Sequence, residues 1–172
     1  MSNISSSSTI IITGAAGFIG SCLTEYLNRQ GFDKLILVDD FTQHQKDDNL
    51  QGKKFIHKIY RDELFDWLNN NNIIADFIFH IGARTDTTEF DYTVFEKLNV
   101  QYSEKIWKYA TQYSIPLIYA SSAATYGDGH LGYDDNHDLI SKLKPLNPYG
   151  LSKQAFDVWA LQEAVAPPFW AG

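Results

Sequence analysis

Three side chains in the second half of the chain have the types and spacing that proton transfer requires. Ser122 closes an apolar run, and Tyr149 precedes Lys153 by four residues, so the latter two would share one face of a helix. A free tyrosine has a pKa of about 10, and lowering it by about three units takes roughly 4 kcal/mol, part of which a neighbouring ammonium can supply. The pattern indicates that Tyr149 removes a proton from a substrate hydroxyl to which Ser122 is hydrogen-bonded.

A glycine-rich turn near the amino end has the composition of a phosphate-binding loop. Gly14, Gly17 and Gly20 follow a G-x-x-G-x-x-G pattern between a β-branched run and an amphipathic segment. Small residues let the backbone approach a pyrophosphate, and the following helix offers free N–H groups and the positive end of its dipole. The glycines could simply form a tight turn, but their place between a strand and a helix favours a dinucleotide site.

Two acids and two bases follow at the distance where a dinucleotide would place its adenosine ribose. Asp39 and Asp40 end the second strand-like run, and their carboxylates would repel a 2′-phosphate, which favours NAD. Lys46 and Arg61 could supply the compensating charge that NADP needs. The residues alone leave this choice open, and a turn-capping role for Asp39 is the structural alternative.

The segments that must position these residues alternate between strand and helix patterns. Strands are expected over 9–13, 35–38, 55–59, 77–81 and 116–120, and helices over 18–30, around 64–68, over 94–113 and over 148–166. The first helix should bury one stripe of its surface, made of Ile19, Cys22, Leu23, Tyr26 and Leu27. Asn147 and Pro148 suit the cap and first turn of the last helix. The alternation predicts a doubly wound parallel α/β sheet of the Rossmann type.

Composition narrows the function classes. The chain has 172 residues, a formal net charge of -7 and 44% hydrophobic residues, so we expect one domain over 1–172 and neither nucleic acid nor anionic membranes as partners. A single cysteine and five histidines without ligand spacing argue against a disulfide or a metal site. No apolar run is long enough to cross a bilayer, and we expect a cytoplasmic protein.

The end of the chain favours a fragment. Pro167 and Pro168 should stop the last helix, and Phe169 and Trp170 follow where another strand would be expected. We therefore expect a truncated domain that lacks its C-terminal strands and a substrate domain.

Together these motifs resemble the extended short-chain dehydrogenase/reductase superfamily. The likeness rests on residues 13–20, on Ser121-Ser122 and on the Tyr149 to Lys153 segment. Within that superfamily, residues 80–83, 86–91, 119–127 and 144–150 resemble the ADP-glyceromanno-heptose 6-epimerase family. This second likeness runs over nearly the whole chain.

The resemblance implies roles for individual residues. Ser122, Tyr149 and Lys153 would be catalytic. The cofactor would contact Gly14, Gly17, Phe18, Ile19, Gly20, Asp39, Asp40, Lys46, Arg61, Ile81, Gly82, Ala83, Asn99, Tyr149 and Lys153. Three positions depart from the family pattern, because Ile81 stands for a common acid, Arg84 for a small residue and Asp40 for a common asparagine.

The implied reaction is inversion at C6 of an ADP-linked heptose by transient oxidation with bound NADP, or with NAD, in the synthesis of a lipopolysaccharide core precursor. Enzymes of this family continue beyond the position of Gly172, carry a second acid–base lysine there and form homo-oligomers, so this chain alone is expected to be inactive. Two alternatives remain open: another nucleotide-sugar 4-epimerase or 4,6-dehydratase, and a non-catalytic NAD(P)-binding sensor. The presence of Ser122, Tyr149 and Lys153 together counts against the sensor.

Overall fold

The computed structural model describes residues 5–42 and 44–163, which fall into two compact units. The first unit takes its described residues from 1–82 and 110–119, and the second takes them from 83–109 and 120–163. Each unit is considered by itself. The expected end of the last helix at residue 166, the two prolines and the aromatic tail lie outside the described residues.

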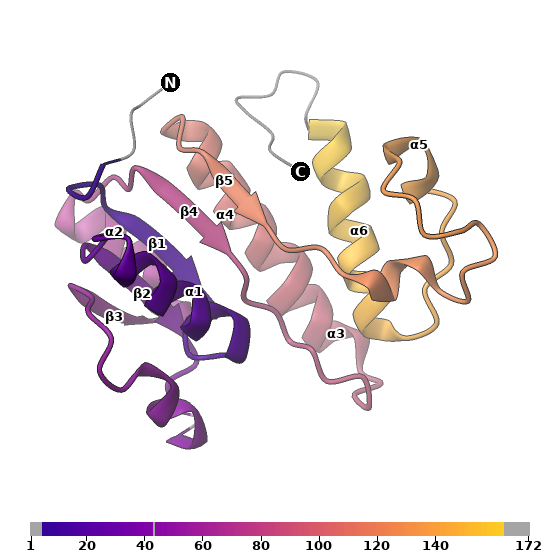
Figure 1. The fold of residues 1–172 in the computed structure, drawn as a ribbon. Coiled ribbons are helices and arrows are strands. Elements are labelled where there is room, and N and C mark those ends of the chain that lie inside the picture. The colour runs from indigo at the N-terminus through magenta and orange to yellow at the C-terminus, as the bar shows by residue number, and fades with distance from the viewer. Residues whose placement is uncertain (1–4, 43, 164–172) are drawn as a thin grey trace. The chain divides into compact units, whose positions relative to one another are not determined.

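The first unit is built on a five-stranded parallel sheet in the order β3-β2-β1-β4-β5. The strands are labelled in Figure 1. Its strands are β1 (Ile10–Thr13), β2 (Leu35–Asp39), β3 (His57–Tyr60), β4 (Phe77–His80) and β5 (Leu117–Tyr119). All four strand pairs are parallel, which confirms the predicted Rossmann-type sheet. The third strand begins two residues later than expected, although the Ile56 N–H still donates to the Leu35 carbonyl at 2.9 Å.

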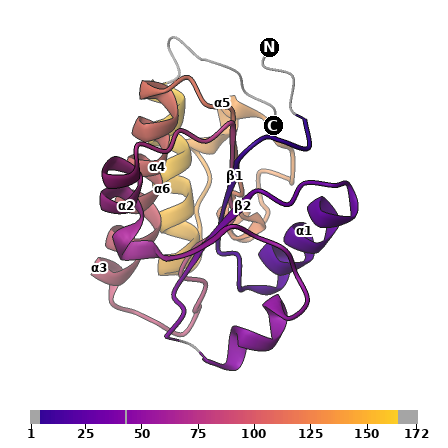
Figure 2. The same cartoon turned by 90° about the vertical axis from the view of Figure 1, so that its left-hand side faces the viewer.

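Helices cover both faces of this sheet. Helices α1 (Phe18–Arg29) and α2 (Leu64–Asn71) lie on opposite faces in Figure 2. Every residue of β1 and β2 is buried, as expected for strands that are covered on both sides. One face of the sheet packs in a hydrophobic cluster that includes Leu27 of α1, Phe41 and Leu50. Leu50 is the last residue of the 3₁₀ segment η1 (His44–Leu50). A further 3₁₀ turn, η2 (Arg61–Glu63), precedes α2.

The predicted buried face of α1 is correct for Leu27, which is buried, and for Leu23, which packs against the core cluster, and wrong for the other three residues. Ile19 and Tyr26 are 63% and 59% exposed and Cys22 is exposed, whereas the buried residues of the helix are Gly20, Ser21, Thr24 and Leu27. The reason is steric, because a Cβ on Gly20 would overlap the carbonyl oxygen of Gly14 and lie 2.8 Å from its carbonyl carbon. The helix thus approaches the preceding turn on its small residues, and close approach outweighs hydrophobicity in choosing the face.

The second unit is helical. It contains α3 (Tyr92–Phe95), the π-helical segment η3 (Glu96–Gln101), the start of α4 (Tyr102–Gln112), the 3₁₀ turn η4 (Ala123–Tyr126), α5 (His137–Ile140) and α6 (Pro148–Glu163). The helix predicted over 94–113 is therefore present, but it begins at Tyr92 because the Asp91 carboxylate accepts the Thr93 N–H at 3.0 Å. The π-helical segment was not predicted.

The start of α6 follows its sequence signals. Asn147 Oδ1 accepts the Gly150 N–H at 2.8 Å, which confirms the predicted cap. Further along, the rings of Phe156 and Trp159 of α6 meet Trp107 of α4 at 6.3 and 6.0 Å between centroids. Within the described part of the chain, no helix is long and apolar enough to span a bilayer.

The close approach of Gly20 can be tested by one methyl group. Gly20→Ala should lower the free energy of unfolding by about 3 kcal/mol, because the added Cβ meets backbone that cannot rotate away. Gly31→Ala is the control, since open space surrounds Gly31 and its φ of +87° alone should cost roughly 1 kcal/mol. Urea denaturation of both variants measures the difference, and equal losses would contradict the steric account.

Candidate functional site

The glycine turn of the first unit is closed from two sides by backbone. Gly14 has a φ of +68°, and a Cβ on it would lie 2.6 Å from the Cα of Gly82. A Cβ on Gly82 would in turn lie 2.9 Å from the Gly14 nitrogen, and the carbonyl carbon of Ile81 is close by on the same side. The turn after β1 and the segment after β4 therefore pack backbone against backbone, with α1 behind them.

The helix start beyond this turn fits a pyrophosphate. Gly17 is the N-cap of α1 and offers no side chain to the first N–H groups, which have no partners within a helix. The side chains of Phe18 and Ile19 are 82% and 63% exposed, and Ala16 carries only a methyl group. Backbone donors at the positive end of a helix, without a bulky side chain over them, are what a phosphate group needs.

A buried polar pair holds the strand ends beneath the turn. Thr13 and His80 face each other across β1 and β4, and Thr13 Oγ1 lies 2.6 Å from His80 Nδ1. The same hydroxyl oxygen accepts the Gly82 N–H at 3.1 Å. Sequence reasoning missed this pair, although aligning the ends of the two strands would have placed both residues at the same level.

Asp39 ties the second strand to the glycine turn. Its side chain is 8% exposed, Oδ2 accepts the Ala16 N–H at 2.9 Å, and Oδ1 accepts the Asp40 N–H at 2.7 Å. Lys46 Nζ lies 3.4 Å from Oδ1. The turn-capping role that the sequence left open is therefore present, and it does not prevent the outer lone pairs from meeting a ribose.

Asp40 forms an ion pair with Arg61, the second cation expected near the ribose. Arg61 lies 3.2 Å from its Oδ2, and the Thr42 hydroxyl donates to Oδ1 at 2.5 Å. The hydrogen bonds from Thr42 lower the pKa of Asp40, with smaller contributions from Arg61 and Lys46, and outweigh the opposing effect of burial. Each cation expected beside a 2′-phosphate thus already has a carboxylate next to it.

In the second unit, Asn99 organises the backbone instead of facing outward. It is 1% exposed and lies in the π-helical segment η3, a deviation that is frequent at functional sites. Its amide nitrogen donates to the Arg84 carbonyl at 3.0 Å and to Ser152 Oγ at 2.9 Å, while Oδ1 accepts the Arg84 N–H at 2.7 Å. Ser152 donates to the Tyr149 carbonyl at 2.7 Å, so Asn99 links Arg84 and Ala83 beside it to the start of α6.

Ser122 lies against α6 because its neighbours are fixed there. The Ser121 hydroxyl donates to Asp157 Oδ2 at 2.5 Å, and a Cβ on Gly150 would lie 2.7 Å from the Ala124 carbonyl oxygen. Gly150 and Asp157 are seven residues apart and share one face of the helix. Ser122 is therefore beside that face, and its Oγ accepts the Ala124 N–H at 3.2 Å and keeps its own proton to donate.

Lys153 lies on the same face of α6, one turn after Tyr149. It is 3% exposed, and burial lowers its pKa to about 8, although the carboxylate of Asp157 opposes that effect. The Tyr149 side chain is half-buried. An ammonium in a low-dielectric setting beside a phenol stabilises negative charge that develops on the phenol oxygen. The arrangement can therefore move a proton from a substrate hydroxyl to Tyr149.

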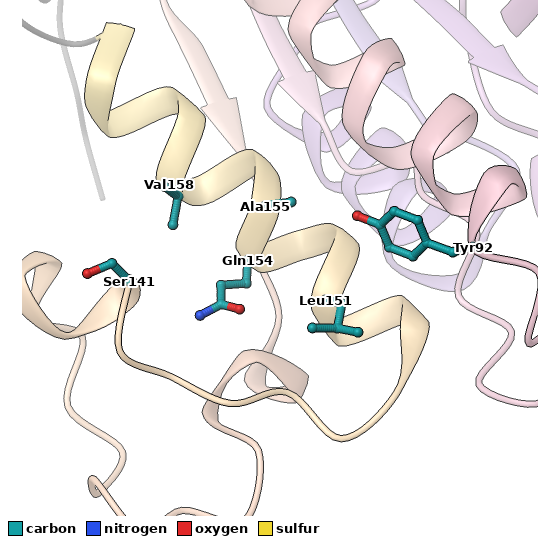
Figure 3. A pocket seen from close by; sticks show the side chains of 6 residues that line it. All are labelled: Tyr92, Ser141, Leu151, Gln154, Ala155 and Val158. Atoms are coloured by element: carbon teal, nitrogen blue, oxygen red, sulfur yellow. The ribbon is translucent and has the colours of Figure 1, made fainter.

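A pocket in the second unit lies on another face of α6. It has a volume of about 520 Å³. Its lining is made of Tyr92, Ser141, Leu151, Gln154, Ala155 and Val158 (Figure 3). None of these was predicted as a site residue, and the helix positions among them point away from the face that carries Tyr149 and Lys153. Among the described residues, no three potential metal ligands come together.

The buried ammonium can be tested through stability. Lys153→Met removes the charge and keeps much of the buried volume. The pKa of Lys153 is about 8 in the folded protein and 10.5 in the unfolded chain. Below pH 8 the wild-type protein therefore carries the full cost of burying the charge, and this cost decreases as the pH rises from 8 to 10.5.

The stability advantage of Lys153→Met over wild type should therefore be larger at pH 7 than at pH 10.5, by about 3 kcal/mol. Urea denaturation at both pH values checks this. A difference that does not change with pH would show that the lysine keeps its ordinary pKa in the folded state.

Comparison with known proteins places this chain in a family. The family model described as "NAD dependent epimerase/dehydratase family" matches residues 10–166. The ADP-L-glycero-D-manno-heptose-6-epimerase of Nitratidesulfovibrio vulgaris is 39% identical over 155 residues, which are 89% of this chain and 48% of that protein. The protein of the same name from Fusobacterium nucleatum is 40% identical over 169 residues, or 95% of this chain and 50% of the relative.

A solved structure agrees with these relatives. The crystal structure of ADP-L-glycero-D-manno-heptose-6-epimerase from Helicobacter pylori matches with a TM-score of 0.73 and 27% identity, covering 91% of this chain and 51% of that one. The chain thus spans about half the length of the curated relatives that it matches. Fold, glycine turn and family model agree, and the chain belongs to the NAD dependent epimerase/dehydratase family.

Proposed function

We propose that the protein containing this chain is a nucleotide-sugar epimerase that inverts C6 of an ADP-linked heptose. The observation that carries the proposal is the buried lysine on α6, one turn from Tyr149 and on the face beside which Ser122 lies. Relatives that are 39–40% identical and named as 6-epimerases support the substrate. A role in lipopolysaccharide precursor synthesis follows from that substrate and belongs to the same proposal.

The first unit has the features that a nicotinamide dinucleotide requires. The turn from Gly14 to Gly20 would hold the pyrophosphate, and Asp39 with Asp40 would lie at the adenosine ribose. The segment from Ile81 to Ala83 would run beside the cofactor after β4. When bound, the cofactor would accept a hydride from the substrate carbon and return it to the opposite face of that carbon, so the reaction would be redox-neutral overall.

The residues of the second unit supply the proton chemistry. Ser122 donates its hydroxyl proton to the substrate oxygen and fixes the direction of that oxygen. Tyr149 takes the proton of the same substrate hydroxyl as the carbon is oxidised, and gives it back when the carbonyl is reduced. Lys153 remains an ammonium and stabilises the Tyr149 phenolate before it takes the proton and again after it has returned the proton. Asn99 is assigned a positioning role, because its amide donors are bonded to Arg84 and Ser152.

The acid–base step is tested by removing one oxygen. In the complete gene product, Tyr149→Phe should lower kcat by about 10³-fold and leave the dissociation constant of the cofactor within a factor of three. Interconversion of the two C6 epimers of ADP-heptose, followed by proton NMR, is the measurement. Wild-type protein that converts neither epimer would sink the substrate assignment, and a 4-epimer or a 4-keto-6-deoxy product would replace it with the corresponding 4-epimerase or 4,6-dehydratase.

The choice between NADP and NAD depends on the two ion pairs at the ribose end. NADP binding requires Lys46 and Arg61 to bond a phosphate although Asp39 and Asp40 already stand beside them. This charge balance, together with the family description, favours NAD in the present sequence.

Asp40→Asn removes one of the two opposing charges and keeps the side-chain shape. The dissociation constant of NADP should fall about tenfold, equal to about 1.4 kcal/mol, while that of NAD changes little. Titration calorimetry with both dinucleotides measures the ratio. Asp62→Asn, an exposed neighbour that loses the same charge, is the control. Unchanged discrimination in Asp40→Asn would show that Asp40 does not act on the 2′ position.

A further inference from the structure

Asp157 is linked both to the segment that carries Ser122 and to the helix that carries Lys153. It lies on α6, four residues after Lys153, and is half-buried. Its Oδ2 accepts the Ser121 hydroxyl at 2.5 Å, a short distance typical of a hydrogen bond to an ionised carboxylate. Nothing in the proposed reaction gives Asp157 a proton to move, so its bond to Ser121 and its nearness to the lysine need another explanation.

The charge of Asp157 acts on the buried side chain of Lys153. Burial is the larger influence on Lys153 and disfavours its ammonium, and the Asp157 carboxylate is the charged group that opposes this. On α6 the other titratable neighbour is Tyr149, one turn earlier. The elements packed against α6 carry further titratable or charged side chains, but burial and Asp157 are the influences on the Lys153 pKa. These side chains are Tyr92 on α3, Glu96 and Lys97 on η3, Tyr126 on η4, and His137 and Asp138 on α5. Asp157 therefore acts as a countercharge to Lys153 from one turn later on the same helix.

The hydrogen bond of Asp157 fixes a backbone segment. Ser121 and Ser122 follow β5, and the chain then turns into η4. This segment is held at one end by Ser121 on Asp157, and at the other by the close approach of Ala124 to Gly150. Ser122 lies between those two attachments. Loss of the Ser121 hydrogen bond would release one end of this segment. The Ser122 hydroxyl would then no longer be held in the direction of the substrate oxygen.

We propose that Asp157 and Ser121 form a positioning pair for the acid–base site, in which Asp157 keeps Lys153 charged and, through Ser121, holds Ser122 against α6. The proposal rests on the roles given above to Ser122, Tyr149 and Lys153. It assigns neither Asp157 nor Ser121 a contact with substrate or cofactor. Its two parts, charge and hydrogen bond, belong to different atoms and can be separated by single substitutions.

The charge is tested without any turnover. In the complete protein labelled with ¹³C-lysine, the Lys153 Cε resonance is identified by its absence from Lys153→Arg and titrated with pH. Asp157→Asn keeps an oxygen that can accept from Ser121 but loses the charge, so the titration midpoint should move to lower pH. Ser121→Ala keeps the charge and should leave the midpoint where it is. Asp157→Glu restores the charge and should restore the midpoint.

The hydrogen bond is tested by kinetics. Ser121→Ala should lower kcat about tenfold with KM unchanged within a factor of two, because it loosens a catalytic hydroxyl and removes no binding contact. Asp157→Asn should lower kcat by at least as much at pH 8, and Asp157→Glu should recover most of it. Glu163→Gln, an exposed carboxylate on the same helix, is the matched control and should change neither kcat nor the Lys153 midpoint.

The outcomes are separable from those of the proposed function. If Asp157→Asn leaves the Lys153 midpoint unmoved, or if Ser121→Ala keeps full kcat, the corresponding half of the pair is wrong. Equal losses in Asp157→Asn and Asp157→Glu with the midpoint unmoved would reduce Asp157 to a packing role and overturn its part of the proposal. If wild type turns over no sugar nucleotide while the midpoint shifts as stated, the charge part stands and the epimerase assignment fails.

Discussion

A lysine side chain that is 3% exposed is a costly feature, because burial in a low-dielectric interior disfavours the ammonium. The candidate active site depends on this one buried charge. Around it the second unit places a phenol one turn earlier on α6, a carboxylate one turn later and a serine segment alongside. The pKa of about 8 keeps this ammonium largely charged near neutral pH.

In the first unit, the candidate site is formed by backbone groups of the glycine turn and not by a buried charge. A dinucleotide turn needs backbone that nothing covers, and that backbone is supplied by glycines packed directly on one another after β1 and β4. Thr13 and His80 form a hydrogen bond beneath the turn, and the Asp39 carboxylate accepts two backbone N–H groups at its edge. Rigid positioning of backbone donors, without side chains in front of them, is the common result.

The sequence predicts the strands well and the packing of α1 poorly, for a physical reason. Runs such as Ile10 to Ile12 are buried on both faces wherever the sheet forms, so their pattern is unambiguous. The buried face of α1 is chosen by the approach of Gly20 to Gly14, which a hydrophobic stripe cannot reveal. The bond between Ser121 and Asp157 joins residues 36 positions apart, and no local pattern indicates it.

The titration of Lys153 in the wild-type protein tests the central claim most directly. Followed by the ¹³C shift of its Cε atom, the side chain should titrate with a midpoint of about 8, well below that of an exposed lysine. A midpoint at the ordinary value of about 10.4 would mean that the ammonium is solvated. The buried charge around which the acid–base site is built would then not exist.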